Sequence, residues 1–449
     1  MLTIKLARGN VRRSVRDFSI YFATLAFASC LLYSFLASTD YLLALDLTLD
    51  QRASFAKAGE VLQAFAVFID VIFCFLLGYA NAFLLRRRKR EFGLYLIVGL
   101  EPRGVAAVLA VECTLVGTVA LACGLFLGWL LSPVFSLVAA FVFGAPWRPA
   151  LVFSFASAAQ CACSFIVISA IAAVASVRGV CKRPIVELIH ADKVPEKRRL
   201  AGVRSLRVQK IAAAILLALV WGVCLLQPGY FIVFIIPMGF VALFGSYFLI
   251  RVLYATVPER LRRRPERYWA GVTPFTVRQL EARTESGAMA MAAECVLLAA
   301  SMCMTLAGLA FSVGMRAGSL GQSAQALLPV AYSCVFYGAA FLVAAAAVLA
   351  LQQLAQASEA GCSYRTLAVL GAPEGMRRAS VRVQVGASFA LPTAIACAHC
   401  IFGFVLIGVL SVMTGAEGFL PLAGGTLAFT LCVLVVYCLL CMRVCQAEV

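Results

Sequence analysis

Four polar side chains stand inside long apolar runs of the chain: Asp70, Glu112, Glu294 and His399. An ionisable group in such a place could bind a proton or a cation, or could join two helices by a hydrogen bond. For Asp70 and Glu112, a packing role and a functional role are both open. We expect Glu294, near the start of its run, to be structural and within reach of headgroups at the inner face. We expect His399 to join two helices by a hydrogen bond rather than to bind a metal.

The usual patterns of catalytic and nucleotide-binding sites are missing from the chain. A phosphate-cradling loop needs a lysine followed by Ser or Thr, and no lysine here has such a neighbour. The only histidines are His190 and His399, so a two-histidine metal site would need two distant segments to meet. We therefore expect no catalytic residue, no metal and no cofactor in this chain. Energy would come from another chain or from an ion gradient.

Composition places the chain among membrane proteins with several spans. It has 449 residues, of which 63% are hydrophobic and 13% charged, and its mean hydropathy is +0.96. Soluble domains carry about 25% charged residues. The net charge of +17 comes from cations that cluster in short links between apolar runs. Cations in such links fix topology and meet anionic lipid, so we expect membrane lipids and no nucleic acid as partners.

The apolar runs are long enough to form helices that cross a bilayer. A span needs about 20 apolar residues, and a helix satisfies every backbone group within one segment. We therefore predict an all-α membrane protein with about ten transmembrane helices. The ten runs are residues 18–38, 61–85, 105–131, 151–177, 210–226, 231–255, 288–313, 327–351, 383–412 and 422–442.

The distribution of cations predicts the orientation of these spans. Of the 38 Lys and Arg residues, all but Arg52, Lys57, Arg148 and Arg316 fall on one side when the spans alternate. Cytoplasmic links carry the excess of Lys and Arg. Both termini are therefore predicted to be cytoplasmic, with an even number of spans in the cell membrane.

The spans and links define six predicted segments. They comprise an amphipathic helix along the inner surface, two four-helix units, a helical pair between these units, and two basic cytoplasmic linkers. In that description the inner-surface helix is residues 1–17, the four-helix units are 18–177 and 288–449, the pair is 210–255, and the linkers are 178–209 and 256–287.

Two links resemble each other. Residues 85–103 lie between the second and third runs and begin with five consecutive cations, which cannot sit in hydrocarbon. A weaker copy spans residues 361–374, and Gly371 follows Gly99 by 272 positions. Gln384 follows Glu112 by the same interval. These matches predict two related halves, each presenting a connector to the cytosol.

Four motifs occur in order along the chain. Residues 6–13 read Leu-Ala-Arg-Gly-Asn-Val-Arg-Arg, and residues 79–83 read Tyr-Ala-Asn-Ala-Phe. Residues 88–95 read Arg-Lys-Arg-Glu-Phe-Gly-Leu-Tyr, and residues 364–372 read Tyr-Arg-Thr-Leu-Ala-Val-Leu-Gly-Ala. Their order and spacing resemble the FtsX-like ABC transporter permeases, and more narrowly the bacitracin-resistance type. The two four-helix units would then be FtsX-like units.

The resemblance implies a permease subunit in the cytoplasmic membrane of a bacterium. It would work with a separate ATP-binding subunit, which would bind ATP and magnesium. In the family, the connector between spans two and three docks on that ATPase. The implied docking residues of the first connector are Arg90, Glu91, Phe92, Gly93, Leu94, Tyr95 and Gly99, and those of the second are Tyr364, Leu370 and Gly371.

One departure from the family bears on function. The bacitracin-type permeases carry a large extracellular domain between spans seven and eight, where this chain has only the short segment 315–326. Export, extraction from the membrane, or mechanical signalling remain open as tasks, with antimicrobial peptide resistance as one setting. Expected partners include a second copy or a homologous permease, and a sensor histidine kinase. The alternatives are a non-transporting scaffold that binds a sensor kinase or cell-wall hydrolase, and an ion-coupled secondary transporter.

Overall fold

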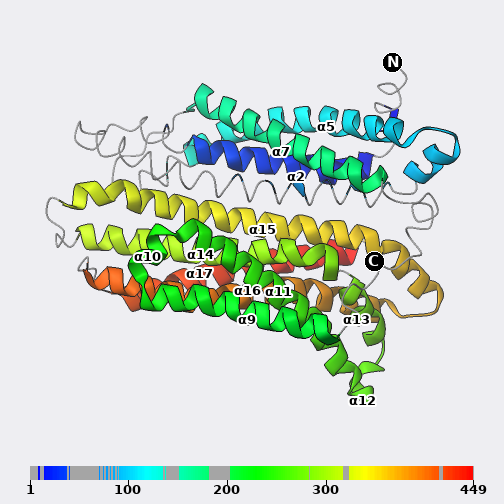
Figure 1. The fold of residues 1–449 in the computed structure, drawn as a ribbon. Coiled ribbons are helices and arrows are strands. Elements are labelled where there is room, and N and C mark those ends of the chain that lie inside the picture. The colour runs from blue at the N-terminus through cyan, green and yellow to red at the C-terminus, as the bar shows by residue number, and fades with distance from the viewer. Residues whose placement is uncertain are drawn as a thin grey trace. The chain divides into compact units, whose positions relative to one another are not determined.

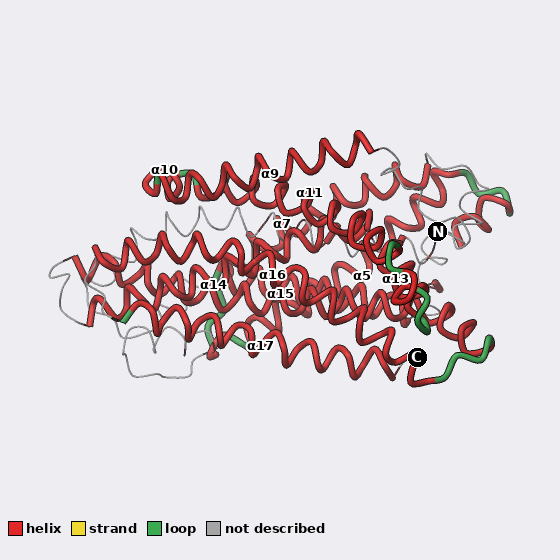
Figure 2. The backbone as a smooth tube through the Cα atoms, turned by 90° about the horizontal axis from the view of Figure 1, so that it is seen from below, coloured by secondary structure: helices red, strands yellow, loops and turns green. Residues whose placement is uncertain are grey.

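The described residues form helices joined by turns, with no strand among them (Figure 2). The predicted all-α class is therefore confirmed for this part of the chain. The computed structural model describes residues 9–10, 15–37, 40, 70, 74, 77–78, 81, 84–85, 88, 91–134, 137, 151–181, 203–282, 284–316, 323–413 and 418–447. The helices are α2 (Val15–Leu36), α5 (Pro102–Leu130), α7 (Phe155–Cys181), α9 (Val203–Leu226), α10 (Pro228–Val233), α11 (Ile235–Arg262), α12 (Pro265–Tyr268), α13 (Thr273–Ala282), α14 (Thr284–Arg316), α15 (Ser323–Val369), α16 (Glu374–Met413) and α17 (Phe419–Ala447).

Eight helices within the described residues are long and apolar enough to cross a membrane. They are α5, α7, α9, α11, α14, α15, α16 and α17, and they coincide with the third to tenth predicted spans. The first predicted span corresponds to α2, whose apolar part is shorter. Most of the second predicted span (61–85) and of the inner-surface helix (1–17) lies outside the described residues, so the count of ten stays a prediction.

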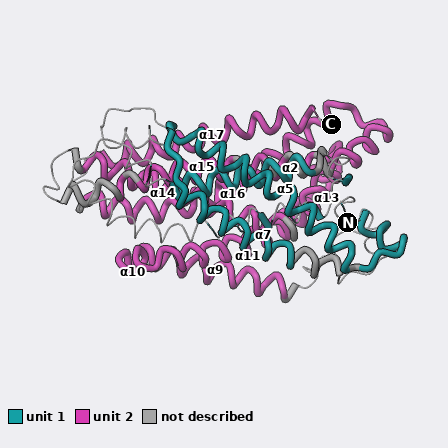
Figure 3. The backbone as a smooth tube through the Cα atoms, turned by 90° about the horizontal axis from the view of Figure 1, so that it is seen from above, with its two compact units in different colours: residues 1–197 teal, residues 198–449 magenta. Residues whose placement is uncertain are grey.

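The chain divides into two compact units, Met1–Lys197 and Arg198–Val449 (Figure 3). The division falls inside the predicted basic linker 178–209. The first unit contains α2, α5 and α7, and the second contains the helices from α9 to α17.

In the first unit, α2 packs closely against α5 (Figure 1). A Cβ added at Gly124 of α5 would lie 2.5 Å from the Ala26 carbonyl oxygen, and one at Gly128 would lie 2.6 Å from the ring of Tyr33. Because these contacts advance together along both helices, α2 and α5 run in the same direction. The backbone N–H of Ser154, just before α7, donates to the Tyr33 hydroxyl (3.1 Å), so α7 returns in the opposite direction. Small residues thus permit the close approach of these two helices.

In the second unit, α14 and α15 form the most extensive helix pair. A Cβ at Gly308 would lie 2.7 Å from the Ala331 carbonyl oxygen, and one at Gly338 would lie 2.7 Å from the Thr305 backbone nitrogen. The Ser301 hydroxyl donates to the Gly338 carbonyl oxygen at 2.6 Å. Residue numbers rise along α14 as they fall along α15, so the two helices are antiparallel.

The helix α16 packs along α14 in the same unit. The side chains of Leu306, Ala310 and Ile407 form a buried cluster between them. The helical pair α9 and α11 packs together and reaches α16 through α9. These contacts hold the membrane helices that carry the second connector.

Candidate functional site

The first connector is a short helix that ends in a glycine turn. Residues 91–97 are helical, and Gly99 adopts a φ of 100°. The Leu100 N–H donates to the Tyr95 carbonyl oxygen (3.0 Å), and the Gly99 N–H donates to that of Leu96 (3.2 Å). This pair of bonds is the Schellman motif, in which glycine takes the left-handed position at least cost. The turn leads directly into α5.

The second connector repeats that turn between α15 and α16. Gly371 adopts a φ of 87°. The Ala372 N–H donates to the Leu367 carbonyl oxygen (3.1 Å), and the Gly371 N–H donates to that of Ala368 (3.0 Å). Every donor and acceptor lies 272 positions after its counterpart in the first connector. The two connectors therefore share one backbone motif, as the matching glycines predict.

Each turn presents two apolar side chains to the surroundings. Ile97 and Val98 are 61% and 78% exposed, and Val369 and Leu370 are 88% and 77% exposed. All four lie outside the predicted spans, on the side that carries the cations. An exposed apolar cluster at such a site is typical of a surface that contacts another protein. We call these four residues the connector tips.

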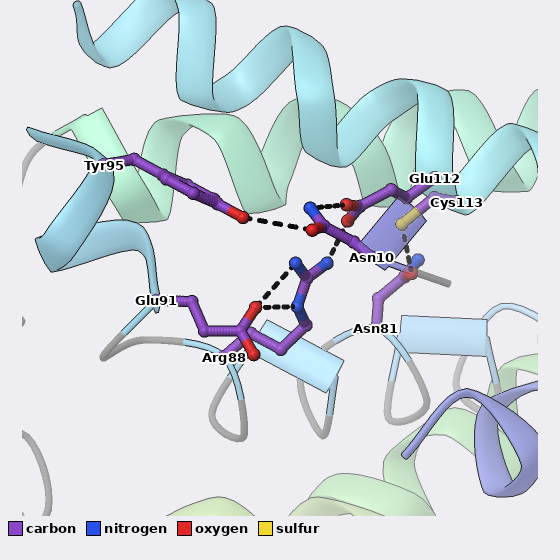
Figure 4. A network of polar contacts seen from close by, with 7 residues as sticks. All are labelled: Asn10, Asn81, Arg88, Glu91, Tyr95, Glu112 and Cys113. Carbon is purple, nitrogen blue, oxygen red and sulfur yellow. Dashed lines mark hydrogen bonds and ion pairs between the residues drawn. The ribbon is translucent and has the colours of Figure 1, made fainter. Parts of the chain in front are cut away.

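A buried ion pair anchors the first connector to α5 (Figure 4). The Arg88 guanidinium donates to the Glu112 carboxylate, and the two side chains are 1% and 0% exposed. The Nε of Arg88 also donates to Glu91 Oε2 at 2.7 Å. Burial alone would lower the pKa of Arg88, but the carboxylates of Glu112 and Glu91 raise it above its ordinary value. Arg88 therefore stays charged.

Further contacts join this ion pair to the N-terminal segment. Asn10 Nδ2 donates to Glu112 Oε1 at 2.8 Å, and the Tyr95 hydroxyl donates to Asn10 Oδ1 at 3.2 Å. The Arg88 guanidinium also lies 5.4 Å from the ring centroids of Phe18 and Phe92. The cluster links the connector helix to α2, to α5 and to residues 9–10.

The second connector is anchored by neutral groups. Gln384 Nε2 donates to the Tyr364 hydroxyl at 2.8 Å, and that hydroxyl lies 3.2 Å from Ser380 Oγ. Ser380 Oγ also lies 2.7 Å from the Thr276 hydroxyl of α13. Gln384 occupies the position that corresponds to Glu112, and Tyr364 corresponds to Phe92. The two anchors therefore occupy matching positions with different chemistry.

A cavity of about 20 Å³ lies in the second anchor. Its lining includes Ala360, Tyr364 and Gln384, together with Gln353 and Gln356 of α15. Ala360 stands 272 positions after Arg88, so the second unit lacks the guanidinium that fills the first anchor.

The predicted docking residues fall into two groups. Phe92 and Tyr364 are 0% and 2% exposed, so both position their connectors and leave contact with a partner to other residues. Leu94 is 53% exposed and Leu370 is exposed at its tip. Arg90 lies outside the described residues. Other members of the set are engaged locally: Glu91 in the Arg88 cluster, Tyr95 with Asn10, and Gly99 and Gly371 in the turns.

His399 forms the helix–helix hydrogen bonds that its sequence position predicts. The Trp221 indole N–H donates to His399 Nδ1 at 3.1 Å, and Nε2 lies 2.9 Å from the Ser246 hydroxyl. Because an indole nitrogen only donates, Nδ1 accepts and Nε2 carries the proton. The Trp221 ring also stacks on Phe402, with centroids 4.6 Å apart. His399 thus joins α9 and α11 to α16.

The buried carboxylates have different surroundings. Glu112 belongs to the ion pair, and Asp70 is partly buried, with its Oδ1 unpartnered among the described residues. Glu294 is 0% exposed, and neither carboxylate oxygen has a hydrogen-bond partner within the described part of the chain. The expectation that Glu294 reaches the inner headgroups is therefore wrong, because its side chain points into the helix core.

Sequence reasoning missed Arg88 and Asn10 as members of the first anchor. In the sequence, Arg88 is one of five consecutive cations that indicate topology, and Asn10 is part of the motif at residues 6–13. The sequence points to them in one way: both lie in motifs that resemble a known family. Asn10 lies in residues 6–13, and Arg88 lies in residues 88–95.

Residues 64–185 match the FtsX family, described as the FtsX-like permease C-terminal domain. The chain is 24% identical over 223 residues to bacitracin export permease protein BceB of Halalkalibacterium halodurans, a match that covers 50% of this chain and 32% of that protein. It is 28% identical over 142 residues to ABC transporter permease protein YxdM of Bacillus subtilis (strain 168), covering 32% of this chain and 22% of that protein. The chain thus matches at most a third of the length of these curated relatives.

Proposed function

Because the chain is an FtsX-like permease that resembles the bacitracin export permeases, we propose that it is the membrane subunit of an ABC complex. The resemblance predicted from the motifs is confirmed, and the chain is a multi-pass integral membrane protein, which in bacteria resides in the cytoplasmic membrane. In the proposed complex, a separate subunit hydrolyses ATP. This chain converts that hydrolysis into movement of its membrane helices.

The observation that carries the proposal is the pair of connectors. Each connector ends in the same glycine turn and exposes two apolar side chains. The turn of the first connector leads into the membrane helix α5, and the turn of the second joins α15 to α16. A partner protein that binds the connector tips can therefore move the membrane helices next to them. A dimeric ATPase, or a pair of ATPase subunits, would offer one binding surface to each connector.

We propose that another subunit forms the extracellular contacts of the complex. Helix α14 ends at Arg316 and α15 begins at Ser323, which leaves no room for a domain between them. We propose that a second permease, either another copy or a homologue, supplies any extracellular contact. Relatives such as BceB are named for bacitracin export, and antimicrobial peptide resistance is a candidate role for this chain. Because the segment between α14 and α15 is short, the alternative function is a non-transporting scaffold that signals through a sensor kinase.

Co-purification from native membranes tests the proposal. The Ile97→Asp/Val98→Asp variant and the Val369→Asp/Leu370→Asp variant should each lose at least about tenfold of the bound ATP-binding subunit, because a charge at an apolar contact removes hot-spot packing. Trp269→Asp is the matched control, since Trp269 is 72% exposed on the cytoplasmic linker 256–287. Unchanged binding in both tip variants, with normal expression, would contradict the docking role.

A further inference from the structure

Glu294 is a buried carboxylate in the interior of the second unit, with no partner among the described residues. Its side chain is 0% exposed and both its oxygens lack a hydrogen bond among the described residues. On its own helix, α14, it lies among Met291, Leu297 and Leu298, which are at most 3% exposed. An isolated carboxylate in such surroundings is strongly disfavoured, because nothing replaces its hydration shell.

Gln352 is a second unpartnered polar side chain, on the facing helix. It is 1% exposed, and neither the oxygen nor the nitrogen of its amide has a hydrogen-bond partner in the described chain. Helix α15, which carries Gln352, packs most extensively against α14. Two orphaned polar groups on one tightly packed helix pair are rare in native proteins, where buried polar groups are normally satisfied.

The antiparallel register places these two groups close in height. Ser301 lies opposite Gly338. Glu294 precedes Ser301 by two turns, so it faces the α15 segment two turns after Gly338, near residues 345–349. Gln352 follows that segment by about one turn. Ala345 and Ala346, both at most 1% exposed, line the facing segment with small side chains.

The direction of the two side chains reduces the difference in height between Glu294 and Gln352. In an α-helix each Cα–Cβ bond leans toward the helix N-terminus. Glu294 therefore leans toward the start of α14, which is the level of Gln352, and Gln352 leans toward the start of α15, which is the level of Glu294. By this tilt the two side chains point toward the same level of the α14–α15 interface, although no hydrogen bond joins them in the described structure.

We propose that Glu294 binds a proton inside the membrane and, as a neutral acid, donates that proton in a hydrogen bond to the amide oxygen of Gln352. The proton comes from water, and no other bond is made or broken. This bond gives each of the two orphaned side chains one partner. It ties α14 to α15 without a charge in the apolar interior. The inference is independent of the ATPase-docking role proposed above.

Infrared difference spectroscopy of the purified protein at neutral pH tests the proposal directly. Subtracting Glu294→Gln from the wild type should reveal the carbonyl band of a protonated carboxylic acid. The control is Glu281→Gln, because the Glu281 carboxylate pairs with Arg262 at 2.7 Å. That difference spectrum should show the bands of an ionised carboxylate instead.

A second variant tests the hydrogen-bond partner. Gln352→Leu should shift the acid band toward the frequency of a carboxylic acid without a hydrogen bond, while Glu294→Gln should fold and insert as the wild type does. A carboxylate band in the Glu294→Gln difference spectrum would overturn the proton site. An acid band that stays unshifted in Gln352→Leu would overturn the pairing.

Discussion

At the scale of single residues, the ion pair between Arg88 and Glu112 is the most consequential contact in the first unit. Both side chains are buried, so each charge depends on the other for its solvation. The sequence marked Glu112 as a candidate, because a carboxylate within a span is unusual. It did not mark Arg88, because four of its neighbours in residues 86–90 are cations with the same topological meaning. Which of five adjacent cations turns inward depends on packing that no local pattern records.

The Glu112→Gln variant should destabilise the protein by about 3–5 kcal/mol, because it leaves the Arg88 guanidinium buried without a carboxylate partner. Unfolding by denaturant in detergent measures the change. The double variant Arg88→Met/Glu112→Leu should be closer to the wild type than Glu112→Gln alone, since replacing both charges removes the uncompensated one.

An exposed ion pair is the control for this experiment. Arg263 and Glu259 lie 3.4 Å apart with side chains 76% and 60% exposed. Glu259→Gln should change stability by at most about 1 kcal/mol. Equal effects of Glu112→Gln and Glu259→Gln would contradict the anchoring role of the buried pair.

At the scale of elements, the two connectors share a turn and differ in their anchors. The shared turn could be predicted from sequence, because Gly99 and Gly371 stand at matching positions and glycine favours the left-handed conformation. The exposure pattern could not be predicted, because a helix of about two turns is too short for a periodic face to emerge. The family-based docking set therefore included Phe92, which is fully buried, and omitted Ile97 and Val98, which are exposed.

The difference between the anchors gives a prediction about the cavity. Ala360→Arg combined with Gln384→Glu should rebuild in the second unit the ion pair of the first, with the new guanidinium entering the cavity between α15 and α16. Each single substitution buries one unpaired charge and should destabilise the protein strongly. The double variant should be more stable than the sum of the two single effects predicts, by about 0.5–3 kcal/mol.

Thermal unfolding of the wild type, both single variants and the double variant completes this cycle. Additive effects, with no recovery in the double variant, would show that the cavity is not the counterpart of the Arg88 site.

At the scale of the whole molecule, the apolar runs predict the membrane helices well and their ends less well. Eight predicted spans coincide with observed helices, because hydrocarbon thickness dictates length and composition. Helix α15 nevertheless continues from the span 327–351 through the polar residues to Val369, a length of about 70 Å at 1.5 Å per residue. A prediction from hydropathy places the end of a span at the membrane surface. A helix continues until a residue that terminates it, which here is Gly371.

The continuity of α15 gives the second connector a mechanical role. In the proposed complex, movement at its tip would pass along one unbroken helix to the interface with α14. In the first unit the equivalent movement would pass through the Arg88–Glu112 pair into α5. The central claim is therefore that both connector tips contact an ATP-binding subunit.

Site-specific photo-crosslinking in native membranes tests this claim most directly. A photoreactive residue would replace Val98 or Leu370 at the tips, or Trp269 as the exposed control. We expect crosslinks from positions 98 and 370 to one ATP-binding protein, and none from position 269. Crosslinks from the tips only to a kinase or hydrolase, or to no protein at all, would contradict it.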